Sequence, residues 1–390
     1  MPTATKVTTA IDTLPHASRR ALLQKAAVLA AMGLGAIPAE AFAGARTAAP
    51  QVLTAWNQGD KSWAGLWTPG ALQLGVALPA RAHQLLILPQ SAQRKGLQAL
   101  VLARRPGEYL LRMDPIGNTA LQWHSMEDDR YLGGHAVLSA DGRRFFTTET
   151  DAATGEGLIA ERDVDSLEKL REFASGGIGP HALLLEPGGT LLVANGGILN
   201  LPETGRRKLN IGTMAPNLTR LDTAHGAVVA QFRLPDPLLS LRHLAIAPDG
   251  TIAVGLQAEH PDPTLRRGAP AMALLDTQGL KTVPWQHAAP PPLWNGYGAD
   301  VCWSEGQFWI SAPQAGWLAG WSPDGKIQTT VALPGAGALA STSTQWLAAG
   351  ERSAVLVGRA GAVSARFSLV VPWDNHAALV EGRHTAGISP

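Results

Sequence analysis

Short apolar runs, each broken by a turn, recur along most of this chain. The stretch GPHALLLEPGGTLLVANGG at residues 179–197 shows the pattern, with an apolar run, a turn of Pro and Gly, and a second apolar run. Runs of this length separated by Gly, Asp or Pro are typical of antiparallel strands joined in hairpins. The pattern therefore predicts β-strands over most of the sequence.

The hairpins repeat at a regular register. The four strongest copies read HQLLILPQ, HAVLSADG, HALLLEPG and HLAIAPDG, and three weaker copies follow. A second strand–turn–strand pattern, such as LAGWSPDGKIQTTVAL, also recurs, which gives four strands per repeat. The copies begin 38 to 62 residues apart, a spacing typical of the blades of a β-propeller. They begin at His83, His135, His181, His243, Asp300, Ala338 and His376.

The two ends of the chain together supply the last repeat. Only 14 residues follow His376, too few for a blade, whereas residues 44–82 contain the strand patterns QVLTAWNQ and SWAGLWTPGALQLGVAL. We therefore predict an all-β fold, a seven-bladed β-propeller whose last blade is closed by N-terminal strands, so that no sheet edge stays open. A β-sandwich is the alternative, and the sevenfold count disfavours it.

The first 43 residues carry a different pattern. SRRALLQ sets Arg19 and Arg20 before an Ala- and Leu-rich stretch that runs to Ile37, and AFA at residues 41–43 offers small residues for cleavage. A membrane anchor is the alternative, but the stretch is at the lower limit of a span. We expect residues 1–43 to be a twin-arginine signal peptide. Residues 44–390 would then form one propeller domain in the periplasm, with no stable membrane span.

Composition narrows the classes of function. A net charge of +1 over 390 residues disfavours nucleic-acid binding. The single cysteine, Cys302, excludes an intramolecular disulfide. Haem-attachment, paired-cysteine, G-x-S-x-G, H-E-x-x-H and phosphate-loop motifs are absent from the sequence. We expect a monomer whose chemistry comes from residues that are dispersed along the chain.

The repeat places histidines at one level of the fold. The first strand of each propeller blade lines the central channel, so the seven starting positions would form a ring at one channel mouth. Five imidazoles and a carboxylate suit iron, copper or zinc better than calcium or magnesium. The alternative is structural histidines like those of WD-repeat propellers, but those lie further before the turn. The candidate metal ligands are His83, His135, His181, His243, Asp300 and His376, and only Ala338 interrupts the run.

The loops between the second and third strands of the blades would open on the same face. Glu149 and Asn195 directly follow apolar strands, and we expect them to surround the ring. The longest loop carries Arg206, Arg207 and Lys208 at its tip, which could receive an anionic ligand or an acidic partner. Solvated surface is the alternative for this tip. Glu149, Asn195, Arg206 and Lys208 are thus the candidate cofactor-binding residues.

Several stretches in combination point to one family. GGHAVLSADGRRFFTTETD, GGIGPHALLLEPGGTLLVANGG, GRRKLNIGTM, LRHLAIAPDG and PWDNHAALV resemble twin-arginine-exported bacterial proteins catalogued as domain of unknown function 1513. The resemblance covers essentially the whole chain after residue 43, and the sixth blade departs from it at GAGALAST, around Ala338. The matching positions are His135, His181, Asn195, Lys208, Asn210, His243 and His376.

The resemblance implies a periplasmic propeller without an established reaction. It also implies imelysin-like and di-haem peroxidase-like proteins as partners in the handling of iron or another metal. Our working hypothesis is a metal-binding protein for the uptake or handling of iron or copper, which we favour over zinc. The alternatives are a metal-dependent oxidoreductase or lactonase-like hydrolase on the same scaffold, and a non-catalytic scaffold that docks another protein.

Overall fold

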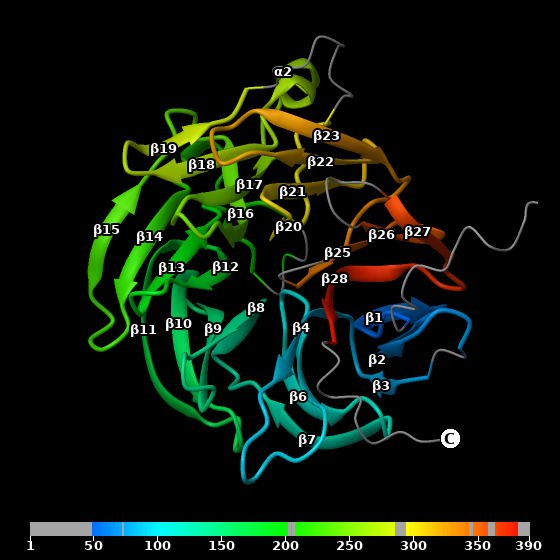
Figure 1. The fold of residues 1–390 in the computed structure, drawn as a ribbon. Helices are drawn as coiled ribbons and strands as arrows, with labels where there is room; N and C mark the ends of the chain where they lie inside the picture. Colours follow the sequence, from blue (N-terminus) through cyan, green and yellow to red (C-terminus); the bar gives the residue numbers. More distant parts are fainter. Residues whose placement is uncertain are drawn as a thin grey trace, which may run out of the picture. The chain divides into compact units, whose positions relative to one another are not determined.

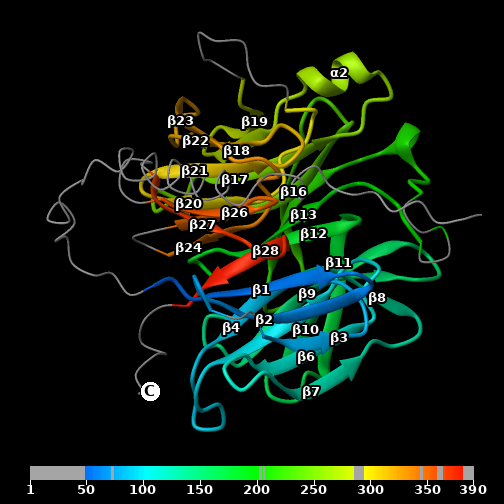
Figure 2. The same cartoon turned by 90° about the vertical axis from the view of Figure 1, so that its right-hand side faces the viewer.

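Seven antiparallel sheets of four strands each surround a central axis in the computed structural model of the chain. The structure describes residues 49–71, 74–201, 204, 207–284, 294–342, 346–357 and 363–380. Figure 1 shows the sheets arranged as blades around the centre, and Figure 2 shows them from the side. The prediction of a seven-bladed β-propeller is confirmed. The predicted signal peptide, residues 1–43, lies outside the described residues.

Six blades are each built from four consecutive strands, which run in order from the channel outward. The first three are β4 (Ala82–Leu88), β5 (Gln98–Ala103), β6 (Tyr109–Asp114) and β7 (Thr119–Ser125); β8 (Arg130–Leu138), β9 (Arg144–Asp151), β10 (Glu156–Asp163) and β11 (Lys169–Ile178); and β12 (Pro180–Leu185), β13 (Thr190–Asn195), β14 (Asn217–Asp222) and β15 (Val228–Phe232). The next three are β16 (Leu239–Ile246), β17 (Ile252–Ala258), β18 (Met272–Asp276) and β19 (Gly279–Thr282); β20 (Val301–Ser304), β21 (Gln307–Ala312), β22 (Trp317–Trp321) and β23 (Ile327–Ala332); and β24 (Leu339–Ser341), β25 (Trp346–Ala349), β26 (Ser353–Val357) and β27 (Val363–Ser368).

The seventh blade joins the two ends of the propeller. Its strand order from the channel outward is β28 (Trp373–Leu379), β1 (Val52–Gln58), β2 (Lys61–Trp67) and β3 (Val76–Leu78). Val52 pairs with Leu379 and Leu53 with Ala378, so the inner strand from the C-terminal part hydrogen-bonds to the first strand of the fold. The predicted closure is confirmed, and it removes the edges that an open ring would expose.

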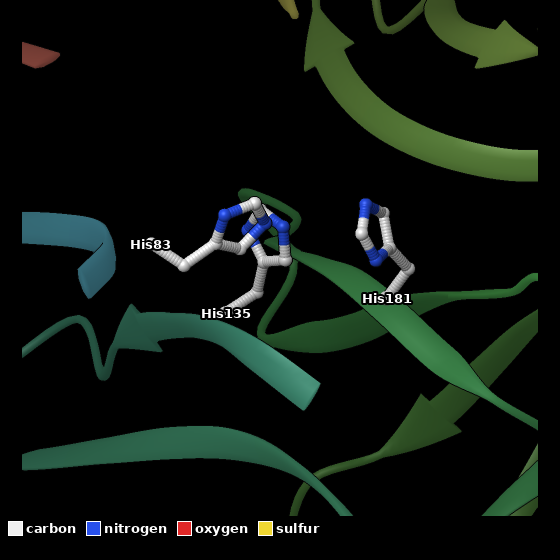
Figure 3. A group of neighbouring side chains, drawn as sticks. All are labelled: His83, His135 and His181. Carbon is white, nitrogen blue, oxygen red and sulfur yellow. The ribbon is translucent and has the colours of Figure 1, made fainter. Parts of the chain in front are cut away.

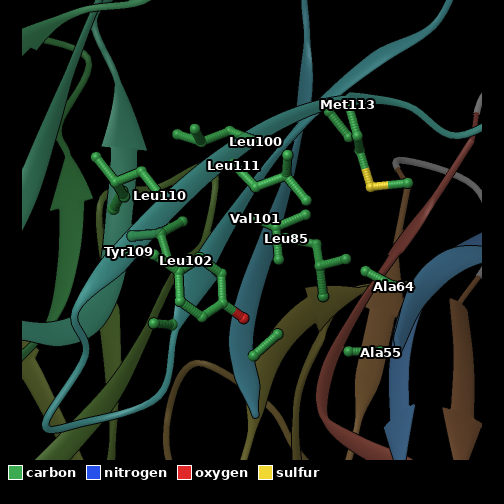
Figure 4. Close-up of a cluster of buried hydrophobic side chains, with 14 of the residues drawn as sticks. Ala55, Ala64, Leu85, Leu100, Val101, Leu102, Tyr109, Leu110, Leu111 and Met113 are labelled. Carbon is green, nitrogen blue, oxygen red and sulfur yellow. The ribbon is translucent and has the colours of Figure 1, made fainter. Parts of the chain in front are cut away.

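The blades pack face to face, and this explains the uninterrupted apolar runs in the sequence. Residues Ala99 to Ala103 of β5 are all buried, because both faces of an inner strand contact a neighbouring blade. The outermost strand β7 alternates between exposed and half-buried residues instead. Figure 4 shows the cluster around β5 and β6, in which Leu100, Val101, Leu102, Leu110 and Leu111 are fully buried.

Helical structure is sparse in the described residues. One short helix, α2 (Pro263–Gly268), and one 3-10 turn (Ile211–Thr213) lie in the loops that follow second strands. Asp262 caps α2 by accepting hydrogen bonds from the backbone amides of Thr264 and Leu265. In the described part of the chain, no helix is long and apolar enough to cross a membrane.

Truncation of Leu53 tests the closing blade. Leu53 lies on β1 and is 1% exposed within the same apolar cluster as β5. We expect Leu53→Ala to lower the free energy of unfolding by about 2–5 kcal/mol, because a buried cavity would remain in the strand that closes the ring. Urea unfolding followed by circular dichroism measures the change. The matched control, Leu121→Ala on β7, removes a side chain that is 43% exposed and should change stability by less than about 0.5 kcal/mol. Equal effects of the two substitutions would contradict this account of closure.

Candidate metal centre

A β-bulge lies at the histidine in the innermost strand of five blades. In β4, β12 and β16, two residues of the inner strand lie opposite one residue of the paired strand. In β8 and β28, three residues of the inner strand lie opposite one residue of the paired strand. Within the described residues, β20 and β24 pair without such a shift. A bulge takes a side chain out of the strict alternation of a strand, so it can direct each histidine into the channel. The bulges include His83 in β4, His135 in β8, His181 in β12, His243 in β16 and His376 in β28.

Gly134 makes room for the bulge in β8. Its φ is +100°, a conformation that favours glycine, and a Cβ there would lie 2.6 Å from Cδ2 of His83. Ala136 follows His135, and its amide donates a hydrogen bond to Oε1 of Gln84 on the neighbouring inner strand, at 2.7 Å. The bulge therefore joins adjacent blades at the level of the histidines.

The five imidazoles form one packed cluster at the channel mouth. His135 contacts the other four rings, at centroid distances of 4.6 to 5.0 Å. Figure 3 shows the rings of His83, His135 and His181 lying near one another on separate segments of the chain. Successive rings around the cluster are separated by 4.6 Å (His83–His135), 4.6 Å (His135–His181), 4.7 Å (His181–His243), 4.8 Å (His243–His376) and 4.7 Å (His376–His83).

The cluster contains two overlapping groups of three that could hold a metal ion. His83, His135 and His181 form one group, and His135, His243 and His376 form the other. In each group the possible ligand atoms lie within 4.8 Å of one another. Nε2 of His181 is 3.3 Å from Nε2 of His243. In a tetrahedral metal site with metal–nitrogen bonds of about 2.0–2.1 Å, two nitrogen ligands also lie about 3.3 Å from each other.

Several ring nitrogens of the cluster lack a protein partner. Buried polar atoms in folded proteins are normally hydrogen-bonded. The unpartnered buried atoms include Nδ1 of His83, Nε2 of His135, Nδ1 of His181 and Nε2 of His376. A metal ion bound among the rings would supply the missing partner to those atoms that face it.

The surroundings of the cluster keep four of the imidazoles neutral. Burial lowers the pKa of His83, His135, His181 and His243 well below 6.5, and repulsion from neighbouring imidazoles and arginines lowers it further. Neutral imidazole is the form that ligates metals. Near pH 7 these four rings therefore present lone pairs instead of positive charges.

Asp300 lies beside the cluster and fixes one of its rings. Its Oδ2 is 3.1 Å from Nδ1 of His376, and its two oxygens accept hydrogen bonds from the amides of Val301 and Leu339. With Nδ1 of His376 turned to the carboxylate, Nε2 remains as the possible ligand atom. Asp300 belongs to neither group of three histidines. Its carboxylate is thus placed to orient His376, and its role as a metal ligand stays a prediction.

Two predicted cofactor-binding residues lie in internal networks. Glu149 is fully buried in blade β8–β11, where its Oε1 accepts hydrogen bonds from Thr147 Oγ1 at 2.6 Å and from Arg162 Nε at 3.0 Å. Asn195 is also fully buried, and its amide donates to the carbonyl of Ser175. Neither residue lines the cavity at the channel mouth. Glu149 lies within β9 and Asn195 is the last residue of β13, so both belong to strands although the sequence suggested that they follow them.

Lys208 does line the cavity at the channel mouth. There its ammonium group forms an ion pair with the carboxylate of Glu259, which follows β17. Arg206, the other candidate of this loop, lies outside the described residues. The loop tip thus contributes at least one cation to the entrance of the channel.

The cavity above the histidines has a volume of about 800 Å³. His83, His181 and His243 border it, together with three arginines that our sequence analysis missed: Arg104, Arg105 and Arg242. Burial, followed by repulsion from Arg242, lowers the pKa of Arg105 to about 10. The sequence signal was present, since Arg242 directly precedes His243 and the pair Arg104–Arg105 directly follows β5.

A second, smaller cavity lies on the side where blades lack a histidine. Its volume is about 270 Å³, and it reaches His243 and His376. Ala338 and several glycines border it, together with Glu351 from the turn between β25 and β26. The interruption that the sequence predicted at Ala338 therefore corresponds to open space beside the cluster.

Comparisons with known proteins identify a family and a fold but no activity. A family model described as "Protein of unknown function (DUF1513)" matches residues 76–380. A functionally unknown protein from Desulfotomaculum acetoxidans superposes with a TM-score of 0.55 at 10% identity, over 86% of this chain and 99% of its own. The structure of U3-55K gives 0.52 at 10% identity, over 75% of this chain and 87% of that chain. A chain of a mitotic checkpoint complex gives 0.51 at 12% identity, over 80% and 87%. No curated protein matches.

The lowered pKa values of the histidines predict loss of stability in acid. In the unfolded chain these imidazoles bind protons near pH 6.5, whereas in the fold they stay neutral to lower pH. Below pH 6.5 the unfolded state therefore holds more protons, and the free energy of unfolding falls as pH falls, by at most about 1.4 kcal/mol per pH unit for each such histidine. Urea unfolding of chelator-treated protein between pH 7.5 and 5.0 measures this slope. His83→Gln should make the slope shallower, because it removes one of the buried imidazoles whose pKa is lowered. A slope that is the same in wild type and His83→Gln would refute this.

Proposed function

This chain belongs to the DUF1513 family of proteins of unknown function, and we propose that its histidine cluster binds a transition-metal ion, iron or copper in preference to zinc. The observation that carries the proposal is the convergence of five buried imidazoles from five blades on one channel mouth. Several of their buried nitrogens lack a protein partner. An ion is the partner that the chemistry of imidazole favours.

The number and type of donors support iron or copper. Zinc sites in proteins are almost always four-coordinate, whereas this cluster offers five nitrogens. Iron and copper accept imidazole ligands, and copper also takes tetragonal arrangements. Calcium and magnesium prefer oxygen, and the nearest carboxylate, Asp300, is engaged by two backbone amides and His376.

We further propose that the protein stores or delivers the metal instead of using it for catalysis. Metal-dependent hydrolysis needs an acid or base beside the ion. Among the described residues that line the larger cavity, Glu259 is the one carboxylate, and Lys208 and Arg242 flank it. Glu149, which the sequence analysis expected near the ring, is paired with Arg162 inside its blade. The pattern at Arg19 and Arg20 supports a periplasmic role, with imelysin-like or di-haem peroxidase-like proteins as proposed partners.

Removal of two central histidines tests the metal site. We expect about one iron or copper ion per chain in untagged protein isolated without chelator, because the two groups of three share His135. The double substitution His135→Ala and His181→Ala should abolish this binding, and elemental analysis after dialysis measures it. His225→Ala, at an exposed histidine, is the control and should retain the ion.

The metal experiment has outcomes that would overturn the proposal. Thermal unfolding and circular dichroism establish whether the double variant is folded, and addition of metal should raise the melting temperature of wild type only. A folded double variant that keeps a full equivalent of metal would contradict the assignment. So would a wild-type protein that binds neither ferrous iron nor copper after incubation.

Asp300 offers a more conservative test of the same site. Asp300→Asn removes the charge that orients His376. Substitution of a residue that hydrogen-bonds to a metal ligand typically lowers metal affinity by about 10–100-fold. We expect weaker binding with unchanged stoichiometry, measured by titration calorimetry. Asp276→Asn, at an exposed carboxylate on β18, is the matched control and should leave the affinity unchanged. Unchanged affinity in Asp300→Asn would mean that His376 needs no such orientation.

A further inference from the structure

The larger cavity carries a strong excess of positive charge. Among the described residues that line it, Glu259 is the only acid, and it is already paired with Lys208. The cationic side chains of the lining are Arg104, Arg105, Lys208, Arg242, Arg266 and Arg267. The net charge of the whole chain is only +1, so the fold concentrates cations at this one mouth of the channel.

These cations come from separate parts of the chain. Arg104 and Arg105 follow β5, and Arg242 lies in the bulge of β16 beside His243. Arg266 and Arg267 belong to α2, in the loop after β17. Residues from two blades and two loops thus meet on one cavity, and only Lys208 of them belongs to the basic loop tip that the sequence pattern singled out.

Two of the arginines are poorly compensated inside the protein. Arg242 is 4% exposed, its Nε has no hydrogen-bond partner, and its Nη2 is 3.8 Å from Glu259, beyond hydrogen-bond distance. Arg105 is half-buried and has no carboxylate within ion-pair distance among the described residues, and its strongest charged neighbour is Arg242, which repels it. A guanidinium removed from water without a partner is costly, above all the buried Arg242. An anion placed between these two groups would remove that cost.

We propose that this cavity binds a small organic polyanion, a molecule with two or more carboxylate or phosphate groups, whose anionic groups pair with Arg105 and Arg242. The planar guanidinium donates two parallel hydrogen bonds to carboxylate or phosphate. The volume of about 800 Å³ lies in the range of sites for small organic molecules and exceeds that needed by one inorganic ion. Gln257, Asn295 and Tyr297 supply neutral polar groups that would orient the rest of the ligand.

The polyanion site is distinct from the proposed metal site in its chemistry. It uses guanidinium groups that bind anions, whereas the histidine cluster offers neutral lone pairs to a cation. The inference therefore stands without a bound metal. His83, His181 and His243 border the same cavity, so a ligand held there would lie next to the histidine cluster.

Titration calorimetry on chelator-treated, metal-free protein tests the proposal. The probes are citrate as a tricarboxylate and fructose 1,6-bisphosphate as a bisphosphate, with inorganic phosphate and uncharged glucose for comparison. We expect at least one polyanion to bind more than tenfold more tightly than inorganic phosphate, and glucose not to bind. The preferred polyanion distinguishes a carboxylate ligand from a phosphorylated one.

Substitutions then locate the site. Arg105→Gln and Arg242→Gln should each weaken polyanion binding at least tenfold, while Arg143→Gln, at an exposed arginine in the β8–β9 turn, should leave it unchanged. Arg105→Lys keeps the charge but loses the planar fork, so it should recover only part of the affinity. Thermal unfolding checks that each variant is folded.

The outcomes separate this inference from the metal proposal. The variant His135→Ala should still bind the polyanion, even where it has lost metal, because His135 does not line the cavity. The inference is overturned if wild type binds neither polyanion, if binding requires a loaded metal, or if Arg105→Gln and Arg143→Gln behave alike. Preference for an acidic peptide over both small polyanions would also overturn it, because the ligand would then be a protein.

Discussion

The pairing of β28 with β1 is the constraint on which the rest of the structure depends. Blades of a propeller contact only their neighbours, so the positions of the inner strands around the channel are fixed only when the ring is closed. The closing strand β28 also carries His376 in its own bulge. Asp374 of the same bulge accepts two hydrogen bonds from Arg81, which directly precedes β4. Closure of the fold and assembly of the histidine cluster therefore rely on the same few residues.

The repeat in the sequence was enough to predict the fold and the meeting of the histidines. Seven copies at one register define seven inner strands, and residues at one register must lie at one level of the channel. The bulges could not be predicted, because they depend on how many residues of one strand face one residue of its partner. Glu149 and Asn195 show a related limit. Each still belongs to its strand, β9 or β13, and is buried in a hydrogen-bond network.

The arginines of the cavity illustrate a further limit of sequence patterns. Arg105 and Arg242 are far apart in the sequence, and each looks like an ordinary surface cation beside a turn. Only the ring brings them together, where they also help to lower the pKa of His135. The positive charge of Arg105 and Arg242, which helps to keep His135 neutral, also opposes the approach of a bare metal cation. An anion in the cavity would relieve this opposition, so the two proposed ligands are electrostatically complementary.

The open space at Ala338 gives the cluster a mechanical asymmetry. On one side the imidazoles are wedged between bulged strands, while on the other Ala338 and its neighbouring glycines leave about 270 Å³ beside His243 and His376. Ligand atoms that lie up to 4.8 Å apart must draw closer to share one ion. His243 and His376 border this free volume, whereas the other three rings are packed among bulged strands. For the proposed metal, the empty sector of the ring therefore leaves two of the five side chains room to adjust to an ion.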